Sequence, residues 1–192
     1  MSVVAIKRRR DGSVIWSGEA DGIRDAVQKT IASGANLDDA DLRDADLRDA
    51  SLAGASLAGA NLDGANLDGA SLVDASLDGA NLRGANLDGA NLDDANLECA
   101  NLECANLRGA KLPDGRTLDE YIEWLPAGLL TQGGKSLAEV VSAWGNHSWA
   151  DCPMATAFGV HSIEDIPACY RAGAALFVAL FDGKQLPRPE AT

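Results

Sequence analysis

The chain has 192 residues, enough for one or two domains, and a formal net charge of −13. Most of this charge lies in residues 35–114, which hold sixteen acidic and five basic side chains. Such a segment is not expected to bind nucleic acid, because phosphate contacts need Lys and Arg. No apolar run is long enough to span a bilayer, and four cysteines are too few for a disulfide scaffold. A protein is therefore the expected partner, with neither nucleic acid nor membrane.

The first 34 residues predict a β-hairpin and a helix that together cap the segment beginning at residue 35. Apolar residues alternate over 3–17 around a turn at 11–13, which is typical of a hairpin. Residues 21–33 have apolar side chains at near-helical spacing, and Gly34 fits a helix C-cap. The run Lys7–Arg10 fits either a nucleic-acid patch or, as we favour, the solvated end of a strand. It comes after the first apolar residues, the reverse of a secretory signal, so we expect a cytoplasmic protein.

Residues 35–114 consist of sixteen tandem five-residue units, each with alanine first and leucine third. A period of five fits neither an amphipathic helix nor a flat strand, because both would scatter the leucines over opposite faces. Only a chain that turns once per unit keeps every leucine and alanine on a shared interior. The pattern predicts a solenoid whose units are stabilised by their neighbours.

This A-(D/N)-L-x-x pattern resembles the pentapeptide-repeat family. The resemblance implies a mainly β solenoid, a right-handed quadrilateral parallel β-helix with one unit per side and four units per coil. Sixteen units would then make about four coils, with leucine and alanine packed inside. We name the sides by their first units: side 1 starts at 35–39, side 2 at 40–44, side 3 at 45–49 and side 4 at 50–54.

If four units make a coil, each residue stacks on the residue twenty positions later, and each side can be read from the sequence. The position after leucine reads Arg43, Asp63, Arg83, Glu103 on side 2 and Arg48, Asp68, Asp88, Arg108 on side 3. Neighbouring opposite charges on side 2 are expected to attract. Sides 1 and 4 are acidic, and side 1 has no cation of its own. They form the candidate acidic interaction surface: Asp38, Asp39, Asp74, Asp78, Asp93, Asp94, Glu98 and Asp114.

Two further positions of the repeat predict structural roles. Asparagines that precede leucine, such as Asn61 and Asn81, are expected to stack as ladders and to bond the neighbouring backbone. Glycine at the fifth position permits a tight corner with positive φ. Cys99 and Cys104 occupy that same outward position, and we interpret them as tolerated surface residues.

After Asp114 the period stops, and residues 115–186 predict a small helical domain before a tail at 187–192. Capping boxes at 117–120 and 136–139 each precede apolar residues at helical spacing. Two more helices are predicted near 153–159 and 167–182. The aromatic residues of this domain form the candidate assembly surface: Tyr121, Trp124, Trp144, Trp149, Phe177 and Phe181.

No pattern in the chain indicates catalysis, a metal or a cofactor. His147, Cys152, His161 and Cys169 lack the close pairing that zinc sites need, and no nucleophile motif surrounds Cys152. No glycine-rich phosphate-binding loop is present. We therefore predict a protein that is not an enzyme.

The predicted function is a protein-binding module built on an acidic rod. The family resemblance implies that such a rod can mimic DNA and occupy the basic site of a DNA-binding protein, such as a topoisomerase or a defence enzyme, in a phage or bacterial setting. The alternative is a rigid stalk or scaffold whose helical domain mediates homodimerisation or partner recognition. The acidity fits either a binding role or simple solubility.

Overall fold

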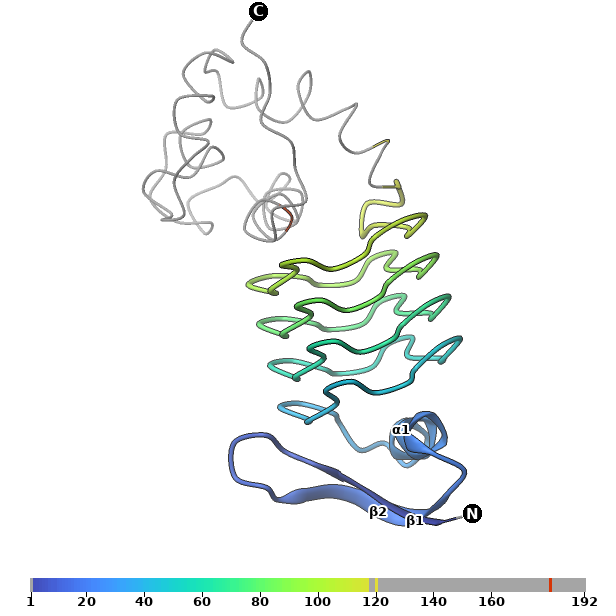
Figure 1. Cartoon of the computed structure of the whole chain (residues 1–192), viewed down its shortest axis with the longest axis vertical. Helices are drawn as coiled ribbons and strands as arrows, with labels where there is room; N and C mark the ends of the chain where they lie inside the picture. Colours follow the sequence, from blue (N-terminus) through green and yellow to red (C-terminus); the bar gives the residue numbers. More distant parts are fainter. Residues whose placement is uncertain (1, 118–119, 121–179, 181–192) are drawn as a thin grey trace, which may run out of the picture.

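The computed structural model describes residues 2–117, 120 and 180, in which a hairpin and a helix precede a regular stack of coils (Figure 1). The predicted helical domain lies outside these residues, apart from 115–117, Glu120 and Leu180. The tail at 187–192 and all six residues of the candidate assembly surface also lie outside them. Within the described part of the chain, no helix is long and apolar enough to cross a membrane.

The hairpin pairs β1 (Ser2–Lys7) with β2 (Val14–Ala20) in antiparallel register, with a bulge between Ile6 and Lys7. Its inner face carries Ile6, which is buried, and Trp16, which packs against the core. The indole of Trp16 covers Gly18 two residues along the same strand. Beyond β1 the chain pairs with the first coil, since Arg9 N–H donates to Asp39 O at 2.8 Å and Asp41 N–H donates to Lys7 O at 2.8 Å.

Helix α1 (Ile23–Ala32) lies beside the hairpin at the start of the rod (Figure 1). It buries Ala26, Val27 and Thr30, and the Thr30 hydroxyl donates to Ala26 O. The helix ends in a Schellman motif, because Gly34 has φ 76°, Gly34 N–H donates to Ile31 O and Ala35 N–H donates to Thr30 O. Gly34 therefore has the C-cap role that the sequence predicts.

Residues 37–112 form a parallel β-helix in which each coil takes twenty residues. Parallel bridges run from Asp41↔Asn61 to Asn91↔Lys111, always between residues twenty positions apart. Between coils, Leu62 N–H donates to Asn81 O, Gly64 N–H to Arg83 O, and Asn81 N–H to Ala60 O, at 2.7 to 2.9 Å. Four five-residue units thus make one turn of the chain, and residue i stacks on residue i+20.

The interior of the rod is a column of leucine and alanine. All sixteen repeat leucines from Leu37 to Leu112 are at most 3% exposed, and the alanines from Ala40 to Ala110 are at most 7% exposed. Corners form where the alanine N–H donates back to the preceding leucine carbonyl, as Ala60 does to Leu57. From Asp39 to Gly109 the fifth residue of each unit has positive φ, which defines a type II turn. The predicted orientation of the repeat is confirmed.

The described chain leaves the rod through a short antiparallel return. Lys111 pairs with Thr117, and Leu112 N–H donates to Arg116 O at 2.6 Å. Thr117 N–H then donates to the Glu120 carboxylate, and Glu120 N–H donates to the Thr117 hydroxyl. This reciprocal pair is the capping box that the sequence predicts at 117–120.

Candidate acidic interaction surface

Asparagine side chains form hydrogen-bonded ladders along sides 2 and 3 and join successive coils there. On side 2, Asn81 Nδ2 donates to Asn61 Oδ1 at 3.1 Å, and Asn101 Nδ2 donates to Asn81 Oδ1 at 3.2 Å. On side 3, Asn86 Nδ2 donates to Asn66 Oδ1 and Asn106 Nδ2 donates to Asn86 Oδ1. The ladders confirm the structural role predicted for these residues.

An aspartate heads each ladder in the first coil and pairs with an arginine two residues later. Arg43 donates two hydrogen bonds of 2.8 Å to Asp41, and Arg48 donates through Nε and Nη2 to Asp46. The Arg48 hydrogen bonds lower the pKa of Asp46 to about 2, and those of Arg43 lower the pKa of Asp41. Both pairs are exposed at the surface.

These pairs add to the alternating charge ladder that the sequence predicts on side 2. The hydrogen bonds from Arg43 go to Asp41, which offers two-point contact within its own coil, and the charge of Asp63 one coil away also helps to raise the pKa of Arg43. The predicted contact between coils is present between later coils of the same side, where Arg83 Nε lies 3.7 Å from Glu103 Oε2. Charge pairing within a coil therefore dominates at the start of the rod.

Four of the eight candidate acidic residues have partners. Asp38 accepts hydrogen bonds from the Ser56 hydroxyl and from Ala58 N–H. Asp39 Oδ1 lies 3.0 Å from Arg10 Nε, although this buried oxygen accepts no hydrogen bond. The remaining two form ion pairs, Asp93 with Lys111 and Asp114 with Arg116.

The cation missing from side 1 is supplied by the N-terminal hairpin. Arg10 reaches Asp39 because the hairpin tip docks against the first coil through Arg9. This contact depends on how two separate elements meet, so the repeat alone does not predict it. On side 4 the cation is Lys111, which forms an ion pair with Asp93. Lys111 stands before a leucine, at the position where the sequence pattern predicts asparagine ladders, so the pattern does not indicate this ion pair.

The other four candidates stand together on two neighbouring corners of the rod, and we call them the acidic surface: Asp74, Asp78, Asp94 and Glu98. Asp74 stacks on Asp94, and Asp78 stacks on Glu98, since each pair is twenty residues apart. Backbone hydrogen bonds join the coils at both corners, from Asp74 N–H to Asp93 O and from Gly79 N–H to Glu98 O. Among the described residues, none of the four forms an ion pair. Stacked carboxylates about 4.8 Å apart concentrate negative charge on these corners.

Three aspartates at the fifth position pack differently, each over a glycine of the next coil. A Cβ built on Gly59, Gly64 or Gly69 would lie 2.5 to 2.9 Å from the Oδ1 atom of Asp39, Asp44 or Asp49 respectively. These carboxylates therefore lie flat along the rod. On side 4 the column is Asp74, Asp94 and Asp114, so no glycine receives the carboxylate there.

The described residues offer no grouping of three or more His, Cys, Asp or Glu side chains that could hold a metal ion. Cys99 and Cys104 are exposed at corner positions with φ 55° and 58°, where the sequence places them. His147, Cys152, His161 and Cys169 lie outside the described residues. The described surface can offer charge and shape to a partner.

The family model for pentapeptide repeats matches residues 35–74 and 75–112. Residues 35–112 are therefore pentapeptide repeats, and proteins of that repeat family form right-handed quadrilateral β-helices and are generally structural or binding modules. No curated protein matches the chain.

Three solved structures illustrate the similarity. Rfr23 from the cyanobacterium Cyanothece 51142 is 45% identical over 40% of this chain and 52% of its own, with a TM-score of 0.40. HetL from Nostoc sp. strain PCC 7120, involved in heterocyst differentiation regulation, is 41% identical over 40% and 42%, with a TM-score of 0.35. QnrB1, a plasmid-mediated fluoroquinolone resistance protein, is 25% identical over 40% and 40%, with a TM-score of 0.23. The chain spans about half the length of HetL and Rfr23.

Proposed function

We propose that this protein is a non-enzymatic binding module whose acidic surface contacts a basic patch on a partner protein. Where that patch normally holds nucleic acid, as in a topoisomerase or a defence enzyme, the rod acts as a DNA mimic. The charge spacing supports this proposal, because stacked carboxylates at the coil spacing of about 4.8 Å present a row of negative charge to Lys and Arg.

The observation that carries the proposal is the contrast within the candidate residues. Asp38, Asp39, Asp93 and Asp114 have partners in the chain, whereas Asp74, Asp78, Asp94 and Glu98 form no ion pair with any described residue. Like charges stacked on one side destabilise a sheet by roughly 0.2 to 1 kcal/mol per pair. A basic partner removes that repulsion on binding, so the arrangement favours association.

The proposal includes the organisation of the whole chain. The hairpin and α1 (residues 1–34) act as the N-terminal cap, four coils (35–114) form the rod, and a helical domain (115–186) precedes the tail (187–192). The cap covers backbone groups at the first coil that would otherwise pair with another chain. The protein works in the cytoplasm and needs no cofactor.

Competition with DNA tests the binding role directly. A fluorescent DNA duplex is bound to each member of a panel of purified DNA-binding proteins, including DNA gyrase, and is then titrated with this protein. We expect displacement from at least one of them. A variant with Asp74→Asn, Asp78→Asn, Asp94→Asn and Glu98→Gln should displace at least about tenfold less well, a loss of about 1.4 kcal/mol.

The matched control neutralises four carboxylates on other sides by Asp44→Asn, Asp63→Asn, Asp68→Asn and Asp88→Asn, and has the same net charge as the test variant. If both variants lose activity equally, the effect comes from total charge and the acidic surface has no specific role. If the wild-type protein displaces DNA from no member of the panel, the DNA-mimic version is wrong. Displacement should also weaken as salt is raised.

The second candidate function is a rigid stalk whose helical domain assembles the protein into a homodimer. The uniform ladder of bonds between coils favours it, because repeated short-range contacts make a stiff rod. Light scattering on the full chain and on a chain that ends at Glu120 separates the two roles. A dimer that becomes a monomer on truncation supports assembly through the C-terminal region, and two monomers contradict it.

A further inference from the structure

The N-terminal hairpin extends the sheet of side 2 by two strands. Arg8, which follows β1, forms an antiparallel bridge with Ala40, and Asp41 N–H donates to Lys7 O at 2.8 Å. β1 is therefore the next strand after the first coil on side 2. β2 pairs with the other edge of β1 and lies at the N-terminal end of the described structure (Figure 1). The strand order on this side is β2, β1 and then the bridged positions 41, 61, 81 and 101.

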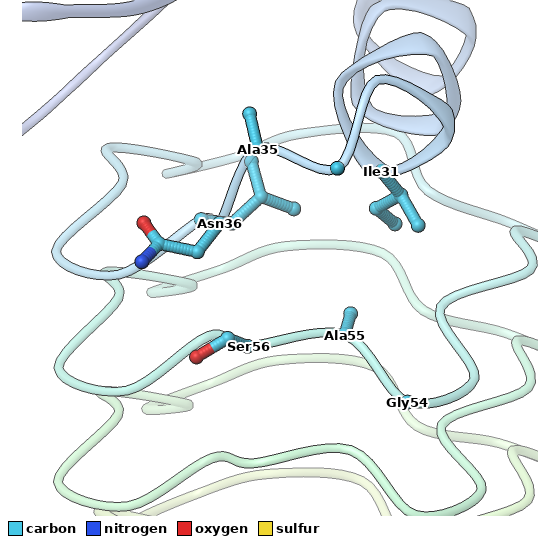
Figure 2. A pocket seen from close by; sticks show the side chains of 8 residues that line it. Ile31, Ala35, Asn36, Gly54, Ala55 and Ser56 are labelled. Atoms are coloured by element: carbon cyan, nitrogen blue, oxygen red, sulfur yellow. The ribbon is translucent and has the colours of Figure 1, made fainter.

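Helix α1 covers the neighbouring sides of the first coil. Figure 2 shows Ile31, near the end of α1, separated by a pocket from Ala55 and Ser56 at the start of side 1. On side 3, the side chain of Arg24 in α1 donates to Arg48 O at 2.8 Å. A helix satisfies its N–H and C=O groups internally, so it does not continue a sheet. Among the described residues, side 2 is the side on which strands of the cap continue the sheet.

The outer edge of β2 has open backbone groups. Lys7 directs its carbonyl towards the coil, so Ala5, two residues earlier, has its backbone groups on the same edge of β1. Ser17 stands directly opposite Ala5, so its N–H and C=O point away from β1. Glu19 has the same orientation, since its carbonyl accepts from Lys29 Nζ of α1 at 2.9 Å. Ser17 N–H, Ser17 C=O and Glu19 N–H have no hydrogen-bond partner among the described residues, and Ser17 is exposed.

We propose that β2 pairs with β2 of a second copy of this chain, in an antiparallel register centred on Ser17. Ser17 N–H of each copy then donates to Ser17 C=O of the other, so the open groups of one copy satisfy those of its equal. A two-fold axis perpendicular to the sheet relates the two copies. The side 2 sheets of both copies become one continuous sheet, and the two rods extend from it in opposite directions.

The charge distribution favours contact at this end of the molecule. Residues 1–34 hold six basic and four acidic side chains, whereas residues 35–114 hold five basic and sixteen acidic ones, so pairing through β2 keeps the two acidic rods apart. In the register centred on Ser17, Lys7 of one copy and Glu19 of the other lie on the same face of the joined sheet, with Cα atoms about 10 Å apart. Both side chains are exposed and long enough to meet, and neither forms an ion pair with a described residue of its own copy.

The backbone contact is tested with two proline substitutions in the full chain. Ser17→Pro removes the outer N–H of β2 and keeps the hydrogen bonds between β2 and β1. Ala5→Pro is the matched control, because it removes the outward N–H of the directly opposite residue on β1. Light scattering should give Ala5→Pro the molar mass of the wild type and Ser17→Pro at most half of it. A monomeric wild type, equal effects of the two prolines, or an assembly that Ser17→Pro leaves intact would overturn the proposal.

A charge swap tests the register and still decides the matter if Ser17→Pro does not fold. Lys7→Glu should raise the dimer Kd at least about tenfold, measured by sedimentation velocity over a concentration series, because it brings two acidic side chains together. Adding Glu19→Lys should restore the wild-type Kd. Within one chain Lys7 lies opposite Val14 and Glu19 opposite Val3, so rescue reports a contact between copies. A Kd that Lys7→Glu leaves unchanged, or that the second substitution does not restore, would overturn the proposal. The acidic surface is unaltered in all these variants.

Discussion

The Asp44 carboxylate lies over Gly64, its neighbour in the next coil, and a Cβ on Gly64 would stand 2.5 Å from the Asp44 Oδ1 atom. The two residues are twenty positions apart and occupy the same corner of successive coils. Gly64 also has φ 67°. Glycine is therefore required here for two separable reasons, its backbone conformation and the space that Asp44 occupies.

The first prediction separates these two reasons. Gly64→Ala and Gly84→Ala both place a side chain at positive φ, which costs roughly 1 to 2 kcal/mol, but Gly84 has open space where its Cβ would lie. Gly64→Ala should lose up to about 1 kcal/mol more in the free energy of unfolding, because the Asp44 side chain must move. Urea denaturation measures both. Adding Asp44→Gly should remove the difference between them, and a difference that persists would show that Asp44 is not its cause.

The second prediction concerns the orientation of neighbouring side chains. Leu67 is fully buried and Asp68 is exposed. Leu67→Asp should destabilise the protein by several kcal/mol, since it buries an unpaired charge. Asp68→Asn should change the melting temperature little. Circular dichroism thermal melts compare the two, and equal shifts would contradict the interior column of leucines.

The third prediction concerns pH and the Asp46–Arg48 pair. The pKa of Asp46 is lowered to about 2, chiefly by hydrogen bonds from Arg48, against about 3.9 in an unfolded chain. Because the folded pKa is the lower one, the pair's stabilisation is fully present above the unfolded pKa and is lost as pH falls towards about 2. The melting-temperature difference between wild type and Asp46→Asn should therefore be constant above about pH 5 and shrink below about pH 4.

Arg48→Gln provides the control for this pair, because it removes the donor and leaves the carboxylate. Its difference from wild type should shrink over the same acidic range. A difference that stays constant down to pH 2 would show that the Arg48 contact does not lower the pKa of Asp46.

The fourth prediction concerns the stability cost of the acidic surface. Asp94→Asn removes the middle carboxylate of the column formed by Asp74, Asp94 and Asp114, and it should raise the free energy of unfolding by roughly 0.2 to 1 kcal/mol at low salt, with less gain as salt increases. Asp93→Asn instead breaks the ion pair with Lys111 and should give no such gain. Equal effects of the two neighbouring substitutions would mean that Asp94 is not repelled by Asp74.

The sequence predicts the rod well because one residue type repeats at one spacing. A leucine every fifth position requires a turn every fifth position, and Asn61 stacks on Asn81 because the coil length is fixed. The same periodicity predicts the stacking of Asp74 on Asp94. The prediction of the rod needs no knowledge of any other part of the chain.

Contacts that depend on where separate elements meet could not be predicted in this way. Arg10 belongs to the hairpin, and only the docking of that hairpin brings it to Asp39. Arg43 has two carboxylates within reach, and the choice of Asp41 depends on side-chain geometry that the repeat pattern does not contain.

Residue i stacks on residue i+20 throughout the rod, so the number of residues between two positions fixes the angle between them about the rod axis. Removing one five-residue unit between Asp78 and Asp94 would rotate everything after it by a quarter turn about the axis, so the carboxylates of Asp94 and Glu98 would leave the corners that Asp74 and Asp78 occupy. Removing four units, which is one whole coil, would restore the orientation of these carboxylates and shorten the rod by only about 4.8 Å. Natural variation in length that preserves a common orientation should therefore come in steps of twenty residues.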